Sequence, residues 1–124
     1  MTRQDRIKAL KQAAKERVLI LDGSWGVMIQ KRGLAETDYR GEAFKAAPGQ
    51  LKGNNDLLCV TRADIIADLH DQYFAAGADI SETNTFSATS IGQGEYAQEA
   101  AVRDINFEGA RIAREVAEIG RAHV

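Results

Sequence analysis

The chain has 124 residues, of which 44% are hydrophobic, 27% charged and 6% aromatic. This length suits one small domain or a piece of a larger one, and the composition is that of a globular protein. One Pro and 11 Gly exclude a collagen-like chain, and no apolar run approaches the roughly 20 residues that span a bilayer. One Cys excludes an internal disulfide and, together with a polar N-terminus unlike a secretory signal, predicts a cytoplasmic protein.

The charge is distributed unevenly. The net charge of −2 gives no broad electrostatic case for binding nucleic acid or a membrane. Residues 1–17 nevertheless carry six basic side chains against Asp5 and Glu16. A basic arm could bind nucleic acid, but it lacks interleaved aromatic residues, so we favour the solvated face of a short helix. The apolar side of that helix would consist of Ile7, Leu10, Ala13 and Ala14.

Two apolar runs are typical of strands. The run at 18–21 is continuous, as in a strand buried on both faces of a parallel sheet, and it ends at Asp22. Residues 78–83 predict a second strand, and residues 57–60 a short extra one. Residues 31–56 are polar and rich in turn formers, and a loop of this length is uncommon unless it has a functional or covering role.

Helices are predicted beside these strands. Residues 27–30 begin a short helix, and Thr61 is placed as the N-cap of a longer one that Gly77 ends. A further helix spans about 98–117. Its apolar stripe consists of Val102, Ile105, Ile112 and Val116. Strands that alternate with helices predict a parallel α/β fold.

Two polar clusters follow the predicted strands. Asp22 and Gly23 come directly after the first strand, and Asn84, Thr85 and Phe86 come where the second runs out. In a parallel α/β fold both clusters face the same opening. A carboxylate at Asp22 could hold a substrate ammonium, and Gly23 allows close approach of the backbone. The residues support equally a plain turn, which Asp22 caps and in which Gly23 has a positive φ.

Three other features have ordinary structural explanations. Residues 92–94 resemble a phosphate loop only loosely and follow no strand, so a turn that links helices is the better interpretation. Cys59 and His70 match no zinc spacing, which favours a small buried thiol and an imidazole on a helix surface. Trp25 could line a pocket or cover the rim of the fold, and the sequence does not decide between them.

Five segments carry motifs that occur together in one family. They are 18–23 with its Asp-Gly turn, 26–30, 39–42 with Arg-Gly-Glu, 51–58 with Lys-Gly-Asn-Asn-Asp, and 76–86 with Glu-Thr-Asn-Thr-Phe. The first and last resemble homocysteine S-methyltransferases in general. The Arg-Gly-Glu and Lys-Gly-Asn-Asn-Asp motifs resemble the N-terminal homocysteine-binding domain of the cobalamin-dependent methionine synthases. The similarity covers about residues 5–118.

This resemblance implies an eight-stranded parallel β/α barrel of TIM type. A complete barrel takes about 250 residues, so the chain would be an incomplete N-terminal portion of one. The resemblance also implies a zinc ion, held by three cysteines, that binds the homocysteine sulfur as a thiolate. The methyl donor would be methylcobalamin, regenerated from methyltetrahydrofolate, and cobalamin- and folate-binding domains of the same full-length chain would be the partners.

The resemblance also implies roles for individual residues. Asp22 would contact the amino acid part of homocysteine with Gly23 close by, and Asn84, Thr85 and Phe86 would line the same mouth. We therefore predict a fragment of a methyltransferase that makes methionine from zinc-bound homocysteine. The alternatives are a homocysteine S-methyltransferase with another methyl donor and a non-catalytic half-barrel that binds a small ligand.

The chain departs from the family in the first turn. Ser24 and Trp25 stand where a small residue followed by Met is usual, and Val27 stands where Thr is usual. The soft metal ligands are Cys59, His70 and His123, and none matches the position of a zinc cysteine. We therefore expect this chain by itself to bind no zinc and to transfer no methyl group.

The last six residues have two interpretations. Residues 119–124 can be encoded by ATC GGA AGA GCA CAC GTC, a string that matches a common sequencing-library adapter read in frame. We therefore predict residues 1–118 as the native part of the domain and 119–124 as a non-native tail. The alternative is a genuine polar helix end, with Gly120 just past the last turn and basic side chains near the helix dipole.

Overall fold

The computed structural model describes the backbone of residues 1–122 and the side chains of residues 1–120. Helices make up 60% of the chain. The α-helices are α1 (Arg3–Glu16), α2 (Trp25–Gln30), α3 (Glu36–Arg40), α4 (Leu58–Thr61), α5 (Ala63–Ala75), α6 (Ser90–Gly94) and α7 (Val102–Ala122). Two short 3-10 helices, η1 (Asn55–Leu57) and η2 (Glu99–Ala101), precede α4 and α7. No helix of this part of the chain is both long and apolar enough to cross a membrane.

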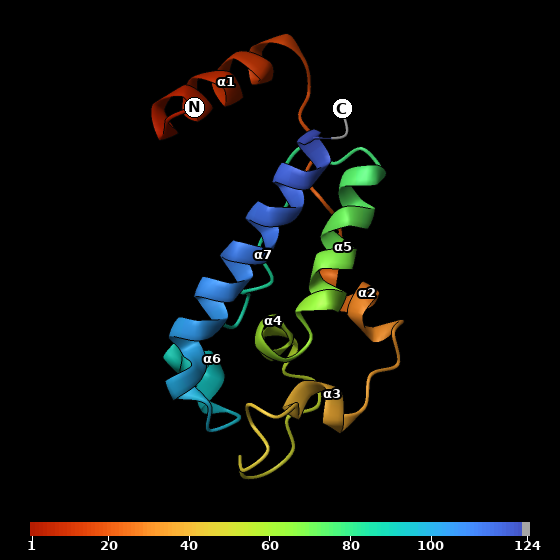
Figure 1. Ribbon diagram of the computed structural model, residues 1–124, viewed down its shortest axis with the longest axis vertical. Coiled ribbons are helices and arrows are strands. Elements are labelled where there is room, and N and C mark those ends of the chain that lie inside the picture. Colours follow the sequence, from red (N-terminus) through yellow and green to blue (C-terminus); the bar gives the residue numbers. More distant parts are fainter. Residues whose placement is uncertain (123–124) are drawn as a thin grey trace.

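The core lies between α5 and α7. These two helices pack side by side along the long axis of the molecule, and α4 contacts both (Figure 1). Side chains with no exposed surface come from α4, α5 and α7, and they include Leu58, Ile66, Leu69 and Ile105. Each such burial stabilises the fold by about 1.5–3 kcal/mol. In the stripe predicted for α7, Ile105, Ile112 and Val116 are buried and Val102 is half-buried, which confirms the apolar face.

The predicted fold class, an α/β portion of a TIM-type barrel, is wrong for the described residues, which form no strand or sheet. The two predicted strands do run side by side and parallel, but they meet at one isolated bridge between Leu21 and Ile80. The Asp22 N–H donates to the Ile80 carbonyl at 2.9 Å, and the Asp79 N–H donates to the Ile20 carbonyl at 2.8 Å. The pairing ends with these few bonds.

Exposure explains why no sheet forms. A continuous apolar run suits a strand that is covered on both faces. In this structure Val18 is 84% exposed and Ile20 is 58% exposed, so the first segment lacks that cover within residues 1–122. The short strand predicted at 57–60 is also wrong, since these residues end η1 and form most of α4. Leu57, Leu58 and Cys59 are buried by helix packing, and an apolar run of four residues does not show whether it is buried in a helix or in a strand.

The boundaries of α5 follow the sequence only in part. Thr61 is the last residue of α4 and does not cap α5, which begins after Arg62. The side chain of Asp64, in the first turn of α5, binds the Arg62 guanidinium at 3.0 Å instead of capping the helix. The stop at Gly77 is confirmed, because α5 ends just before it and its φ of 110° belongs to the region that glycine favours.

The long polar segment 31–56 is organised by one ion pair. Arg40, at the end of α3, donates to the carbonyl oxygens of Phe44 at 3.1 Å and Ala47 at 2.7 Å. It also pairs with Glu36 at 3.3 Å, and the Glu36 carboxylate accepts from the Lys52 N–H at 2.7 Å. The segment therefore folds back on α3 and carries residues 53–56 towards the centre of the molecule.

Helix α1 stands apart from the other helices (Figure 1). None of its residues is buried against the described part of the chain, which agrees with a solvated helix. The connection that follows it is fixed by Arg17, whose guanidinium binds the Asp79 carboxylate at 2.9 and 2.8 Å. Asp79 also accepts from the Ile20 N–H at 2.9 Å. The Arg17 hydrogen bond, followed by that of Ile20, lowers the pKa of Asp79 to about 2.

We expect this contact to give the fold a pH dependence. A carboxyl whose pKa is lowered on folding adds stability that is present above its ordinary pKa of 3.8 and is lost as the pH falls through about 2. The wild-type urea midpoint should therefore drop between about pH 4 and pH 2, and the drop should be smaller in Asp79→Asn. Asp71→Asn, at an exposed position of α5, is the control and should titrate as wild type. Identical pH profiles for all three proteins would contradict this account.

Candidate functional site

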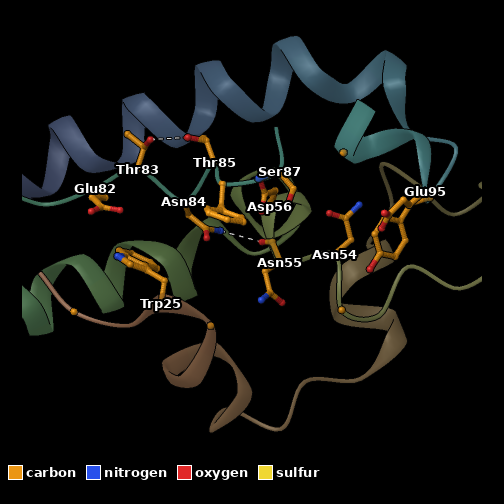
Figure 2. Close-up of a pocket in the computed structure, with 16 residues that line it drawn as sticks. Trp25, Asn54, Asn55, Asp56, Glu82, Thr83, Asn84, Thr85, Ser87 and Glu95 are labelled. Atoms are coloured by element: carbon orange, nitrogen blue, oxygen red, sulfur yellow. Dashed lines mark hydrogen bonds between the residues drawn. The ribbon is translucent and has the colours of Figure 1, made fainter. Parts of the chain in front are cut away.

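A pocket of about 440 Å³ lies between the segment 82–87 and the segments around Trp25 and 53–56 (Figure 2). Its described lining includes the carboxylates of Asp56, Glu82 and Glu95 and no Lys, Arg or His. The pocket therefore carries negative charge without a positive side chain to balance it. Carboxylates form strong charge-assisted hydrogen bonds with ammonium groups, so the lining favours a ligand with a positively charged end.

Asp22 lies directly behind the wall of this pocket. Its Oδ2 atom accepts from Trp25 Nε1 at 2.8 Å, from Ser81 Oγ at 2.9 Å and from the Glu82 N–H at 3.0 Å. Trp25 and Glu82 line the pocket, whereas Asp22 does not. Its Oδ1 atom is buried and has no donor among the described residues. A buried acceptor without a partner costs about 1–3 kcal/mol, so this oxygen is prepared to accept a hydrogen bond.

Asp22 and Gly23 do not form the simple turn that the sequence also allowed. The Asp22 carboxylate ties together Trp25 and residues 81–82, and Gly23 has no positive φ. Gly23 instead gives the Tyr73 ring room to approach the backbone. A Cβ atom there would lie 3.1 Å from the ring of Tyr73, whose hydroxyl donates to the Ser24 carbonyl at 2.7 Å.

The second predicted cluster, Asn84, Thr85 and Phe86, lines the pocket, and each of its residues has a different role there. Asn84 is buried, and its side chain donates to the Asn55 carbonyl at 2.9 Å (Figure 2), which joins two walls of the pocket. Thr85 shares a hydrogen bond of 2.7 Å with Thr83. Phe86 is 99% exposed and stands at the rim. Trp25, left undecided by the sequence, lines the pocket.

His70 is not the surface residue that the sequence predicted. It has no exposed surface, its Nδ1 lies 2.6 Å from Ser81 Oγ, and its ring meets that of Trp25 edge to face at 4.5 Å. Burial lowers the pKa of His70, and the Asp22 charge opposes that shift. The imidazole is therefore held neutral behind the pocket. Periodicity placed it on a helix but could not show that Trp25 and Ser81 cover it.

Sequence reasoning did not single out the far end of the pocket. Asn54 and Gln93 are buried and exchange amide hydrogen bonds of 2.7 and 3.1 Å. The Asp56 carboxylate accepts from the Ser87 N–H at 2.7 Å, and burial raises the pKa of Asp56. The available signal was the Lys-Gly-Asn-Asn-Asp motif, which contains Asn54 and Asp56. Gln93, the partner of Asn54, lies on α6, the segment interpreted as a turn between helices.

The described residues do not fit a zinc ion. No group of three His, Cys, Asp or Glu side chains in this part of the chain is placed to hold a metal. The Cys59 thiol is buried and donates to the Asn84 carbonyl at 3.2 Å, and burial raises its pKa to about 12. Zinc binds the thiolate, which such a site disfavours strongly. A corrin ring is far larger than a pocket of about 440 Å³, so methylcobalamin does not fit inside it either.

The sequence profile of the homocysteine S-methyltransferase family matches residues 19–123. The chain belongs to this family. The match includes the bridge at Leu21, the whole pocket and the helices α2 to α7. Membership supports a methyltransferase that acts on homocysteine. Membership does not identify the methyl donor. The matched range begins after α1, which ends at Glu16.

The shape of the far wall depends on a glycine in α6. A Cβ atom on Gly92 would lie 2.6 Å from the backbone oxygen of Ser87, so Gly92→Ala must displace the pocket segment. We expect a loss of about 1–3 kcal/mol in the free energy of unfolding, measured by urea denaturation. Gly120→Ala is the control, since a Cβ there meets no described atom within 4 Å beyond the adjacent turns of its own helix, and helix propensity favours Ala by up to about 1 kcal/mol. A Gly92→Ala protein as stable as wild type would contradict the tight contact.

Proposed function

We propose that this chain forms the homocysteine-binding part of a methyltransferase that produces methionine, and that Asp22 accepts a hydrogen bond from the substrate ammonium. The single observation that carries this proposal is the buried Oδ1 atom of Asp22, which lacks a donor among the described residues. An ammonium group offers three donors and a positive charge, and it would satisfy this oxygen. Family membership supplies the identity of the amino acid.

The pocket supports the same substrate class. Its volume of about 440 Å³ is ample for a small amino acid, and its carboxylates attract the ammonium end. Gly23, the chain neighbour of Asp22, and Glu82, whose N–H donates to Asp22 Oδ2, both line the pocket. In this proposal the chain binds and orients the amino acid part of homocysteine. Asn84 holds the opposite wall in place through Asn55.

We propose methylcobalamin as the methyl donor, with zinc and the donor bound by parts of the protein other than the described residues. The Arg-Gly-Glu motif at 40–42 and the Lys-Gly-Asn-Asn-Asp motif at 52–56 support this choice, because they resemble the cobalamin-dependent enzymes. Arg40 and Glu36 hold that same segment against α3, and it reaches the pocket at 53–56. Another methyl donor for homocysteine remains the alternative reaction.

The role of Asp22 can be tested by binding. Asp22→Asn keeps an oxygen that can accept from Trp25, Ser81 and Glu82 but removes the negative charge, so the fold should survive. We expect the Kd for L-homocysteine, measured by NMR titration of the 124-residue chain, to rise about tenfold or more. Asp71→Asn, at an exposed position of α5, should bind as wild type. An unchanged Kd in a folded Asp22→Asn protein removes Asp22 from the site.

The proposal also predicts what the isolated chain does not do. Because the described residues offer no set of three metal ligands, elemental analysis should find no stoichiometric zinc in the purified chain. Incubation with methylcobalamin and homocysteine should then give no methionine, since the unbound homocysteine thiol stays largely protonated at neutral pH. One tightly bound zinc per chain together with turnover would show that the metal site lies in this chain.

A further inference from the structure

The orientation of Asp22 depends on a second layer of side chains. Three donors converge on Oδ2 and no donor among the described residues reaches Oδ1. Two of those donors, Trp25 Nε1 and Ser81 Oγ, belong to side chains that contact His70. His70 comes from α5, a helix of the core, and has no exposed surface. The buried His70 imidazole therefore contacts both side chains, Trp25 and Ser81, that orient the Asp22 carboxylate.

The direction of each hydrogen bond in this chain follows from chemistry. A carboxylate has no hydrogen to give, so the Ser81 hydroxyl donates to Asp22 Oδ2 at 2.9 Å. The Ser81 oxygen can then only accept from His70 Nδ1, at 2.6 Å. His70 is therefore the Nδ1–H tautomer, which leaves Nε2 as a bare acceptor. That atom is buried and has no partner among the described residues.

We infer that Ser81 and His70 are positioning residues that fix Asp22 with Oδ2 occupied and Oδ1 free for the substrate ammonium. This inference rests on the proposed function of Asp22. The proton on Nδ1 holds the Ser81 hydroxyl in one rotamer, and that hydroxyl holds the carboxylate in one rotamer. Burial lowers the pKa of His70, which keeps the imidazole neutral and keeps a second positive charge away from the ammonium site. The charged group that acts on the imidazole is Asp22.

The variants separate positioning from packing. Ser81→Ala removes the hydroxyl, and Ser81→Thr restores it. His70→Leu removes the Nδ1 donor and the unpartnered Nε2 and puts an apolar side chain of similar size in their place. His70→Asn places an amide N–H close to the position of Nδ1. The protein used is the whole 124-residue chain, with folding checked by far-UV circular dichroism.

The readout is recognition of the amine alone. The Kd of L-homocysteine is compared with that of 4-sulfanylbutanoate, which has the same thiol and carboxylate but no ammonium. We expect wild type, Ser81→Thr and His70→Asn to prefer the amine. Ser81→Ala and His70→Leu should lose about tenfold in affinity for L-homocysteine and keep their affinity for 4-sulfanylbutanoate.

Each other outcome has a definite meaning. If wild type shows no preference for the amine, the proposed function of Asp22 fails and the inference falls with it. If wild type prefers the amine and Ser81→Ala and His70→Leu keep that preference, the inference alone fails. Equal losses for both ligands would show that the two residues serve packing only. Independently of any ligand, long-range ¹H–¹⁵N spectra should show the proton of His70 on Nδ1, and a proton on Nε2 would overturn the inference.

Discussion

The Asp22 carboxylate is the point on which the pocket depends. It follows a segment that makes only one backbone bridge to its neighbour, so side-chain hydrogen bonds supply most of the connection between them. Three donors from residues 25, 81 and 82 meet at its Oδ2 atom. Because Trp25 and Glu82 line the pocket, the same carboxylate that joins the segments also sets the position of the pocket wall. The hydrogen bonds to Asp22 therefore both stabilise the fold and shape the pocket.

The helical core supplies the rigid side of this arrangement. Helix α5 carries His70 and Tyr73, and both contact the first turn, His70 through Trp25 and Tyr73 through the Ser24 carbonyl. Helix α7 lies against Thr85 at Gly109, where a Cβ atom would come within 2.7 Å of the Thr85 methyl group. The two polar segments are thus held from opposite sides by the two longest core helices. Irregular segments need such support because they carry few hydrogen bonds of their own.

The pocket is negatively charged, and no group of three potential metal ligands comes together among the described residues. The pocket offers carboxylates and neutral amides, which suit an ammonium, while the buried Cys59 thiol stays protonated. Activation of a homocysteine thiol needs a different chemistry from recognition of its amino group. In the proposed function these tasks are divided between this chain, which recognises the amino acid, and metal ligands that lie outside the described residues.

The sequence by itself determined the helices with a long apolar stripe, the stop at Gly77, the family, and some of the residues that line the pocket, namely Gly23, Asn84, Thr85 and Phe86. These features depend on residues close together in the sequence, or on motifs that can be recognised without knowing which residues are in contact. The tertiary structure decided the rest. The run at 18–21 resembles a buried strand, but a strand needs partners and cover that its own residues do not encode, and here Val18 and Ile20 are exposed. His70 resembles a surface residue, and only the packing of Trp25 against it and its bond to Ser81 reveal a buried imidazole behind Asp22. Burial and hydrogen-bond direction depend on residues distant in the chain, which is why periodicity and spacing could not give them.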